Sequence, residues 1–327
     1  MTGKGKLSVV TLLTALTLSC GTSAVRPQDG TEVWNLVSGG EERMVLVHPP
    51  ATAGEDLPVL LIFHGGYGTA AGAESSYGMS FLADDMGFVA VYPQGLDRHW
   101  NDGRIDPGDL SDVVFVEAVL DSLASRFPVD GERIYATGMS NGGIFCHFLA
   151  HTLPGTFAGI APVCGGIADP GFDWFDPAEP LDVLIIQGTD DPLVPYSGGE
   201  IGFRGGRGSV LGTPEAVRIW RGVNGCLDDN PTTANLPQAS PEDRCNAVYY
   251  LYHGIRDVGL VNIEGGGHVW PGGEQYLPVR VIGRACGDFQ AGPFIWRFFQ
   301  EAHERKTESP GGPERSSTGS MDTGGRT

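Results

Sequence analysis

Short apolar runs alternate with longer helical patterns through the middle of the chain. Six runs have the length of a β-strand and are rich in Val, Ile and Leu: residues 58–63, 87–93, 133–138, 157–163, 182–188 and 258–263. Four segments of helix length lie among or after them: residues 111–127, 140–152, 213–223 and 291–302. Continuous apolar runs indicate strands that are buried on both faces. The order of elements therefore predicts an α/β fold, with a mostly parallel sheet and helices on both of its faces.

The two ends of the chain depart from this pattern. Lys4 and Lys6 precede an apolar run over residues 7–18. This run is too short to cross a hydrocarbon core of ~30 Å, so it predicts an export signal and not a membrane helix. The last residues are polar and have few large apolar side chains with which to offset the entropy of ordering. We expect a signal peptide over residues 1–20, a linker over 21–30, one folded domain over 31–304 and a disordered tail over 305–327.

The export segment ends in the sequence LTLSCG, in which Ser19 precedes Cys20. This resembles the cleavage box of bacterial lipoproteins, where the thiol of the new N-terminal cysteine is lipidated. Ordinary cleavage after the small residues 22–24 would instead release a free protein. Both alternatives take the protein out of the cytoplasm. In the favoured one, only a lipid on Cys20 attaches it to a membrane.

The charge and composition of the chain limit the kinds of partner that it can bind. The 21 Lys and Arg residues against 40 Asp and Glu residues give a formal net charge of −19. A surface of this sign repels a polyanion, so we do not expect nucleic acid as a partner. A hydrophobic content of 41% with 50 glycines fits a globular domain with many tight turns.

Export would place the cysteines in an oxidising compartment. Beyond Cys20 the chain has Cys146, Cys164, Cys226, Cys245 and Cys286, an odd number that leaves at least one thiol unpaired. The stretch between Cys226 and Cys245 is polar and contains proline, so a bridge between these two would order it. We favour that pair, although spacing alone leaves the connectivity open.

The segment IYATGMSNGG places Ser140 at the turn between an apolar strand and a helical stretch. Gly138 and Gly142 flank it in a Gly-x-Ser-x-Gly pattern. Glycines suit a strand that turns sharply into a helix, and small neighbours leave the hydroxyl exposed for attack on an acyl carbon. A serine at such a point can also serve only as a helix N-cap. Because a strand precedes the motif, we interpret Ser140 as a nucleophile.

An alcohol nucleophile needs a base, and His268 in EGGGHVWPGG is the best candidate. It follows an apolar strand in a glycine-rich loop that lets an imidazole project. Asp190 and Asp191 follow another strand, and we choose Asp191 as the acid that orients the imidazole; an Asp-Pro turn and a paired-carboxylate site are the alternatives. The chain order Ser140, Asp191, His268 is the order of α/β-hydrolases.

Acyl transfer also needs hydrogen-bond donors for the developing oxyanion. The segment IFHGGYG places Gly66 and Tyr67 just after a strand, where a backbone N–H of one of them can face the substrate. Asn141 N–H, directly after the nucleophile, is the second predicted donor. A tight glycine turn without a ligand is the alternative for this loop.

A metal site is the competing chemistry for the helix after Ser140. His147 and His151 are four residues apart on this helix, next to Cys146. A zinc hydrolase motif with this spacing carries a glutamate directly after its first histidine, and this chain has Phe148 there. We therefore expect a packing role for the two histidines, and neither a metal nor a cofactor.

Taken together, these motifs resemble the polyhydroxybutyrate depolymerase-like and feruloyl esterase family of exported α/β-hydrolases. The resemblance extends from about residue 40 to 302. It rests on the stretches FHGGYG, YPQG with HWND, SDVVFV, VDGERIYATGMSNGG, QGTDDPLVPY, WRGVNGC and IEGGGHVWPGG, in this order. It implies an α/β-hydrolase fold with Ser140, Asp191 and His268 as the catalytic triad, and a substrate region largely between the acid and the histidine.

The chain departs from the family in places that leave the triad intact. Gln187 stands where many relatives have histidine, Ser111 where an acidic residue is common, and Ile255 where a relative can have cysteine. The family's disulfides therefore cannot be transferred to this chain.

The family acts on aromatic esters of plant polysaccharide, on short acyl esters and on polyester. Four aromatic residues near the motifs could stack an aromatic acyl ring: Tyr67, Trp100, Tyr196 and Trp270. They favour a feruloyl-type esterase over a polyhydroxybutyrate depolymerase. The same motifs also allow a peptidase with an identical triad, or a non-catalytic surface lipoprotein that keeps the fold.

Overall fold

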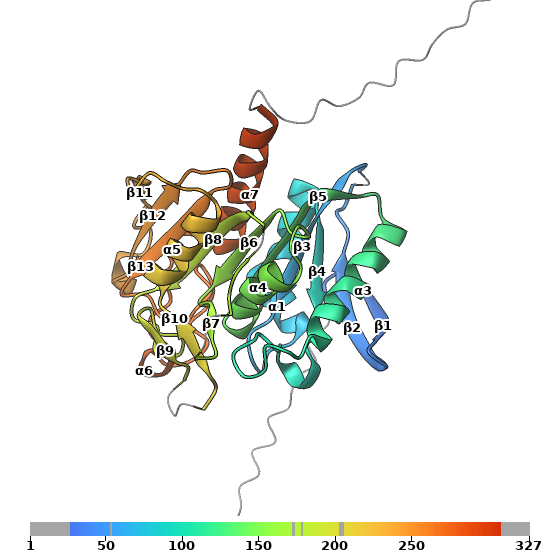
Figure 1. Ribbon diagram of the computed structural model, residues 1–327, viewed down its shortest axis with the longest axis horizontal. Helices are drawn as coiled ribbons and strands as arrows, with labels where there is room; N and C mark the ends of the chain where they lie inside the picture. The colour runs from blue at the N-terminus through green and yellow to red at the C-terminus, as the bar shows by residue number, and fades with distance from the viewer. Residues whose placement is uncertain (1–26, 53, 172–173, 178, 203–205, 309–327) are drawn as a thin grey trace, which may run out of the picture.

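The fold was analysed in a computed structural model of the chain. It describes residues 27–308 except 53, 172–173, 178 and 203–205 (Figure 1). The predicted signal peptide with Cys20, residues 21–26 of the predicted linker and residues 309–327 of the predicted tail lie outside the described residues.

A ten-stranded sheet forms the centre of the described chain, in the order β1-β2-β4-β3-β5-β6-β8-β13-β12-β11. Its strands are β1 Glu32–Ser38, β2 Glu41–His48, β3 Leu57–Phe63, β4 Val89–Pro93, β5 Val129–Met139, β6 Gly159–Val163, β8 Asp182–Gly188, β11 Thr232–Asn235, β12 Asn246–Tyr252 and β13 Val258–Glu264. The six strands from β4 to β13 in this order pair in parallel, and antiparallel strands extend both edges. These six are the six apolar runs, so the predicted parallel sheet is confirmed.

Helices cover both faces of this sheet (Figure 1). They are α1 Ala70–Tyr77, α2 Met79–Met86, α3 Ser111–Arg126, α4 Asn141–Thr152, α5 Thr213–Val223, α6 Val279–Ile282 and α7 Ala291–Glu308, with short 3₁₀ turns at Leu96–Arg98 and Pro241–Asp243. The four predicted helices correspond to α3, α4, α5 and α7. A second, three-stranded sheet has the order β7-β10-β9, from Ala168–Asp169, Ser209–Leu211 and Gly198–Glu200.

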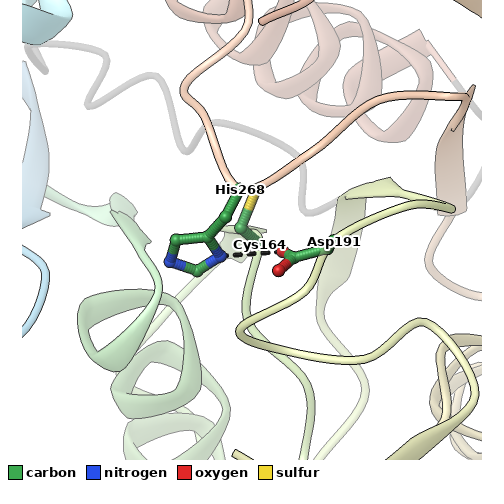
Figure 2. A group of neighbouring side chains, drawn as sticks. All are labelled: Cys164, Asp191 and His268. Atoms are coloured by element: carbon green, nitrogen blue, oxygen red, sulfur yellow. Dashed lines mark hydrogen bonds and ion pairs between the residues drawn. The ribbon is translucent and has the colours of Figure 1, made fainter. Parts of the chain in front are cut away.

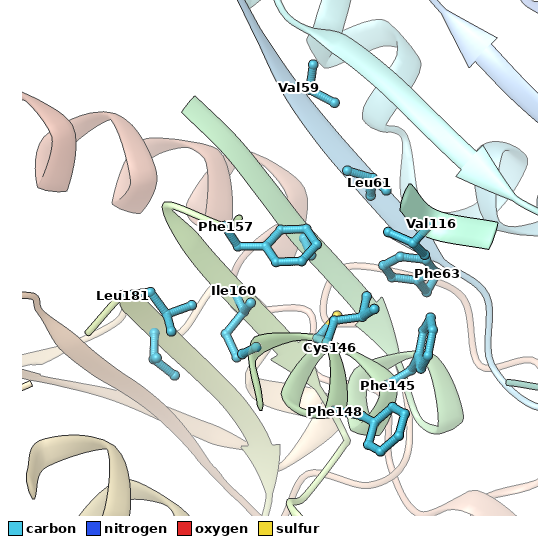
Figure 3. Close-up of a cluster of buried hydrophobic side chains, with 14 of the residues drawn as sticks. Val59, Leu61, Phe63, Val116, Phe145, Cys146, Phe148, Phe157, Ile160 and Leu181 are labelled. Atoms are coloured by element: carbon cyan, nitrogen blue, oxygen red, sulfur yellow. The ribbon is translucent and has the colours of Figure 1, made fainter. Parts of the chain in front are cut away.

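Two apolar layers join the helices to the sheet. Val59, Leu61 and Phe63 of β3 point to the layer under α3, α4 and α5, whereas Leu60 and Ile62 point to the layer under α1, α2 and α7. Figure 3 shows the first layer, in which Phe145, Cys146 and Phe148 of α4 pack against the strands. A fully buried Phe, Leu, Ile or Val side chain in these layers contributes about 1.5–3 kcal/mol. The two layers fix the strand ends from which the site is built.

The last helix extends past the boundary that we predicted for the tail. Helix α7 continues to Glu308, because Arg305 and Lys306 have partners on the folded domain. Arg305 donates to Asp257, and Lys306 donates to the buried carboxylate of Asp182. Residues 305–308 therefore belong to the domain. No helix within the described ranges is both long and apolar enough to cross a membrane.

The predicted bridge between Cys226 and Cys245 is wrong. All five cysteines of the described chain are free thiols. The Sγ of Cys226 lies 3.6 Å from the carbonyl oxygen of Tyr252 and 3.5 Å from that of Arg256, whereas Cys245 lies beside Cys286. The polar stretch between Cys226 and Cys245 is ordered in another way, because β11 pairs with β12 along four residues.

Candidate active site

Ser140 occupies a strained turn between β5 and α4. Its backbone has φ 59° and ψ −123°, a left-handed value that is rare for a residue with a side chain. A Cβ added to Gly142 would lie 2.3 Å from the carbonyl oxygen of Phe63, and one on Gly138 would lie 2.7 Å from the same atom. The turn therefore requires both glycines. The Ser140 hydroxyl makes no capping hydrogen bond to α4, so the helix-cap alternative has no support.

Asp191 and His268 form a buried pair at the carboxyl ends of β8 and β13. Oδ2 of Asp191 lies 2.7 Å from Nδ1 of His268, and the two residues are 5% and 2% exposed. Figure 2 shows the ring and the carboxylate facing each other, with the second ring nitrogen turned away from Asp191. Because an ionised carboxylate only accepts, Nδ1 carries the proton, which leaves Nε2 as a base.

Three further donors hold the Asp191 carboxylate. Its Oδ1 accepts from the backbone N–H of Leu193 at 2.8 Å and of Val194 at 2.9 Å. Its Oδ2 accepts from Nε2 of Gln187 at 3.2 Å. Asp190, by contrast, is exposed and accepts from the hydroxyl of Thr189 at 3.3 Å. The structure therefore brings Asp191, and not Asp190, to His268.

The loop that carries His268 folds back on itself. The N–H of Gly267 donates to the carbonyl of Arg284 at 2.8 Å, and the hydroxyl of Tyr276 donates to the carbonyl of His268 at 3.0 Å. A Cβ on Gly267 would lie 2.3 Å from the carbonyl oxygen of Ile282, so only glycine fits before the histidine. These contacts fix the backbone at His268.

Ser140 and His268 line one cavity of about 1210 Å³. Gly66, Tyr67 and Asn141 line it too, and Asp191 lies behind His268. The structure thus brings the predicted nucleophile, base and oxyanion donors to one hollow.

The three predicted oxyanion donors differ in their backbone hydrogen bonds. The N–H of Tyr67 already donates to the carbonyl of Arg98 at 2.8 Å, so it is not available to a ligand. The N–H of Gly66 has no acceptor among the described residues. Asn141 is the first residue of α4, where a backbone N–H has no intrahelical partner. Gly66 and Asn141 therefore supply the two free amides beside Ser140.

A buried histidine that the sequence analysis did not assign to the site supports this loop. The N–H of Gly95 donates to Nε2 of His64 at 3.0 Å, so Nδ1 carries the ring proton and donates to the carbonyl of Gly65 at 2.8 Å. Burial lowers the pKa of His64 to about 4. His64 is therefore neutral near pH 7 and links two loops at the cavity.

The side chain of Asn141 is fixed by the loop after β4. Its Oδ1 accepts from the N–H of Trp100 at 2.9 Å, and its Nδ2 donates to Oδ2 of Asp102 at 2.7 Å. Asp102 in turn pairs with Arg104 at 2.7 Å. Trp100 and Asp102 belong to the HWND stretch, residues 99–102, which the sequence analysis used only for the family resemblance.

Three of the four aromatic residues that were predicted to bind substrate line the cavity. Tyr67 is 56% exposed and open to the cavity. Trp100 and Trp270 also line it, but Trp100 is 4% exposed and stacks on Phe145, and Trp270 is 5% exposed and stacks on Tyr77.

Tyr196 does not line the cavity, which corrects its predicted substrate role. Its carbonyl accepts from the N–H of Thr213 at 2.8 Å, at the start of α5. Burial, with Tyr250 and Tyr252 nearby, raises the pKa of its hydroxyl. Tyr196 lies in a turn in which the carbonyl of Pro195 accepts from the N–H of Gly198, and its ring lies near Tyr250 and Tyr252 of β12.

His147 and His151, which have metal-ligand spacing, use one ring nitrogen each within the protein. Nδ1 of His147 accepts from the indole of Trp220 at 3.1 Å, and Nδ1 of His151 accepts from the N–H of Asp176 at 3.3 Å. Burial lowers the pKa of His147 to about 3. Both rings pack against Phe175.

Comparison with known proteins places the chain among esterases. The family profile described as esterase PHB depolymerase matches residues 43–174. A putative esterase, NocK, of Nocardia uniformis subsp. tsuyamanensis is 32% identical over 77% of this chain and 78% of its own length. Feruloyl esterase B of Piromyces equi is 29% identical over 69% of this chain, and poly(3-hydroxyalkanoate) depolymerase C of Paucimonas lemoignei is 28% identical over 69%. The matches span 42% and 52% of those two relatives.

A solved structure agrees with the fold. The acetyl xylan esterase from Aspergillus awamori superposes with a TM-score of 0.54 at 15% identity. The match covers 72% of this chain and 94% of that enzyme. At this identity the similarity concerns the fold alone.

Proposed function

The chain belongs to the esterase family that includes polyhydroxybutyrate depolymerases and feruloyl esterases, and from this premise we propose that it is a serine carboxylic ester hydrolase. The observation that carries the proposal is the buried Asp191–His268 pair beside the cavity that Ser140 lines. A surface-binding protein without catalysis would not need a carboxylate with four donors behind one histidine. This argues against the non-catalytic alternative.

In the proposed mechanism, Nε2 of His268 takes the proton of Ser140 as its Oγ attacks the ester carbonyl. Asp191 keeps the imidazole in the tautomer that accepts at Nε2, and stabilises the imidazolium. The imidazolium then protonates the leaving alcohol. Water, activated by the same nitrogen, attacks the acyl-enzyme and releases the acid.

The backbone N–H groups of Gly66 and Asn141 are the proposed oxyanion donors. Neither has an acceptor among the residues that the structure describes, and both lie next to Ser140 at the edge of the sheet. A fixed donor of this kind contributes about 3–4 kcal/mol to the stabilisation of the transition state. His64 and Asp102 act as positioning residues, because each holds one of the two donor segments.

For the substrate we propose a feruloyl-type ester linked to polysaccharide, or a short acyl ester. The cavity is large enough for an aromatic acyl group, and the exposed ring of Tyr67 offers it a stacking face. Polyester and peptide substrates are the alternatives, since the same triad can cleave each of them.

For the location we propose export, with a lipid on Cys20 as the anchor to the cell envelope. The basic and apolar start of the chain and the LTLSCG box support this. Labelling of Cys20 with an alkyne-bearing fatty acid in a bacterial host, compared with Cys20→Ala, tests the anchor.

The activity test compares p-nitrophenyl acetate, p-nitrophenyl butyrate, methyl ferulate and a matched p-nitroanilide. Ser140→Ala should lower kcat/KM on the preferred ester at least about 10⁴-fold. Ser125→Ala, an exposed serine of α3, serves as control and should retain full activity. Faster cleavage of the anilide would make the protein a peptidase. A folded wild type without activity on any of the four would refute the proposal.

A further inference from the structure

Two buried thiols lie side by side next to the loop that carries His268. We propose that Cys245 and Cys286 form a disulfide in the exported protein, which ties this loop to the edge of the sheet. This disulfide is a covalent modification, and it is separate from the ester hydrolysis proposed above. It stands on the geometry of the two cysteines and does not depend on the substrate.

Both cysteines lie where two distant segments meet. Cys245 directly precedes β12, and Cys286 lies between α6 and α7 at the end of the His268 loop. Their sulfur atoms and a carboxylate oxygen of Asp243 lie within 4.8 Å of one another. The two residues are 1% and 3% exposed. A disulfide therefore needs only a small local adjustment.

Asp243 holds the two segments together without help from the thiols. Its Oδ1 accepts from the N–H of Cys245 and its Oδ2 accepts from the N–H of Gly287, both at 2.8 Å. The N–H of Ser240 donates to Asp288 at 3.3 Å, which adds a second link between the same segments. The folded chain thus brings the two cysteines together whether they are oxidised or reduced.

The other thiols of the described chain lie in different surroundings. Cys146 packs in the apolar layer under α4. Cys164 contacts the carbonyl oxygens of Gly267 and Val269, and Cys226 contacts those of Tyr252 and Arg256. Cys245 and Cys286 are thus the one described pair whose thiols contact each other.

The contact between the thiols also shifts their pKa values in the folded, reduced chain. The hydrogen bond from Cys245 lowers the pKa of Cys286, and the same contact together with burial raises the pKa of Cys245. Because this contact forms only when the loop has closed, it does not decide which of the two thiols reacts first.

The oxidant is a disulfide, either of a thiol oxidoreductase or of a small thiol. The thiolate of one of the two cysteines attacks one sulfur of it, forms a mixed disulfide and releases one thiolate. The other cysteine loses its proton and attacks the sulfur of the first, which forms the bridge and releases the second thiolate. Two protein thiols are oxidised and one disulfide is reduced to two thiols. Because both cysteines are covered in the folded chain, the exchange takes place before the loop closes during folding.

The bridge would close a ring over residues 245–286, which contains β12, β13 and His268. The carbonyl of Cys286 accepts from the N–H of Gly272 at 2.9 Å, so the bridge would also restrain the loop four residues after the histidine. Constraining the unfolded chain over a ring of this length should raise Tm by about 6 °C.

Peptide mapping of the full chain tests the proposal. The protein is exported to the periplasm of a bacterial host, denatured with iodoacetamide without reduction, and digested with trypsin. Cleavage at Arg244, Arg256, Arg284 and Arg297 places Cys245 and Cys286 in separate peptides, each of which contains no other cysteine. We expect peptides 245–256 and 285–297 as one cross-linked species that reduction separates. Reduction of the intact protein should lower Tm by about 6 °C.

Single variants supply the controls. Cys226→Ser should keep the cross-linked species and the drop of Tm on reduction. Cys286→Ser should abolish both and leave Cys245 open to iodoacetamide. Carbamidomethylated Cys245 and Cys286 in the unreduced exported protein would overturn the proposal, as would a link from Cys245 to another cysteine. Stoichiometric zinc with both thiols free would replace it by a metal site. The map is read by mass, so it holds or fails independently of esterase activity.

Discussion

The nucleophile half of the site and the acid–base half are built by different means. Around Ser140, glycines pack so closely against the backbone of β3 that no side chain fits. Asp191 and His268 instead lie on longer loops, where side-chain and backbone hydrogen bonds hold them. The turn at Ser140 thus depends on steric contact of its glycines, whereas the side chains of Asp191 and His268 are oriented by polar contact. Substitution of a glycine at the turn should therefore destabilise the fold, whereas substitution of a polar group at the Asp191–His268 pair should lower activity while the fold survives.

The largest expected effect comes from Asp191→Asn in the acid–base half. The amide cannot hold the imidazole in the tautomer that accepts at Nε2, so kcat/KM on p-nitrophenyl butyrate should fall by about 10⁴-fold. The backbone donors of Leu193 and Val194 can still bind the side-chain oxygen, so the urea midpoint should change little. Asp190→Asn, at the exposed neighbour, is the control. A loss below tenfold for Asp191→Asn would remove Asp191 from the triad.

Gly142→Ala, in the nucleophile half, should lower the stability of the fold, unlike Asp191→Asn. The new methyl group would lie 2.3 Å from the carbonyl oxygen of Phe63, and backbone cannot move aside cheaply. We expect the free energy of unfolding to fall by about 3 kcal/mol or more, measured by urea denaturation. Gly131→Ala is the matched control, because a Cβ there meets nothing within 4 Å. Equal stability of the two variants would contradict the steric account.

The same contrast explains what the sequence could predict. The six parallel strands and the turn at Ser140 follow from local patterns, apolar runs and a short glycine motif, and each was found at its place. Asp191 and His268 lie together in the structure because each follows a strand of that sheet, and the carboxyl ends of parallel strands meet at one edge.

Side chains that work through distant partners were missed or misplaced. His64 acts on a loop 31 residues away, and Asp102 on Asn141, 39 residues away. Such pairs leave no periodic signal. Tyr196 was misplaced because its distance along the chain from Asp191 says nothing about the turn at Pro195. The Cys226–Cys245 bridge was wrong for the same reason, since β11 and β12 order the segment between them.

Acid should weaken the nucleophile half through His147 of α4. Burial lowers its pKa to about 3 from 6.5, so between these values the unfolded chain binds the proton and the folded chain does not. Stability then falls as pH falls, by about 2 kcal/mol for this group between pH 7.5 and pH 5. In His147→Gln the decrease should be smaller by that amount, measured by urea unfolding at both values. Parallel pH curves for variant and wild type would refute the assignment.

The smallest effect should come from Gln187, which holds Asp191 without contacting the cavity. Its Nε2 donates to Oδ2 of Asp191 at 3.2 Å and to the carbonyl of Val194 at 3.0 Å. Gln187→Met keeps the volume and removes both donors, so Asp191 should orient His268 less well. We expect kcat to fall about tenfold, which corresponds to ~1.4 kcal/mol, with KM unchanged. A role in packing alone would lower stability and leave kcat as it is. Gln300→Met, on the exposed face of α7, is the control. A fall of kcat without a change of KM would show that the hydrogen bond from Gln187 to Asp191 contributes to catalysis, although Gln187 itself does not line the cavity.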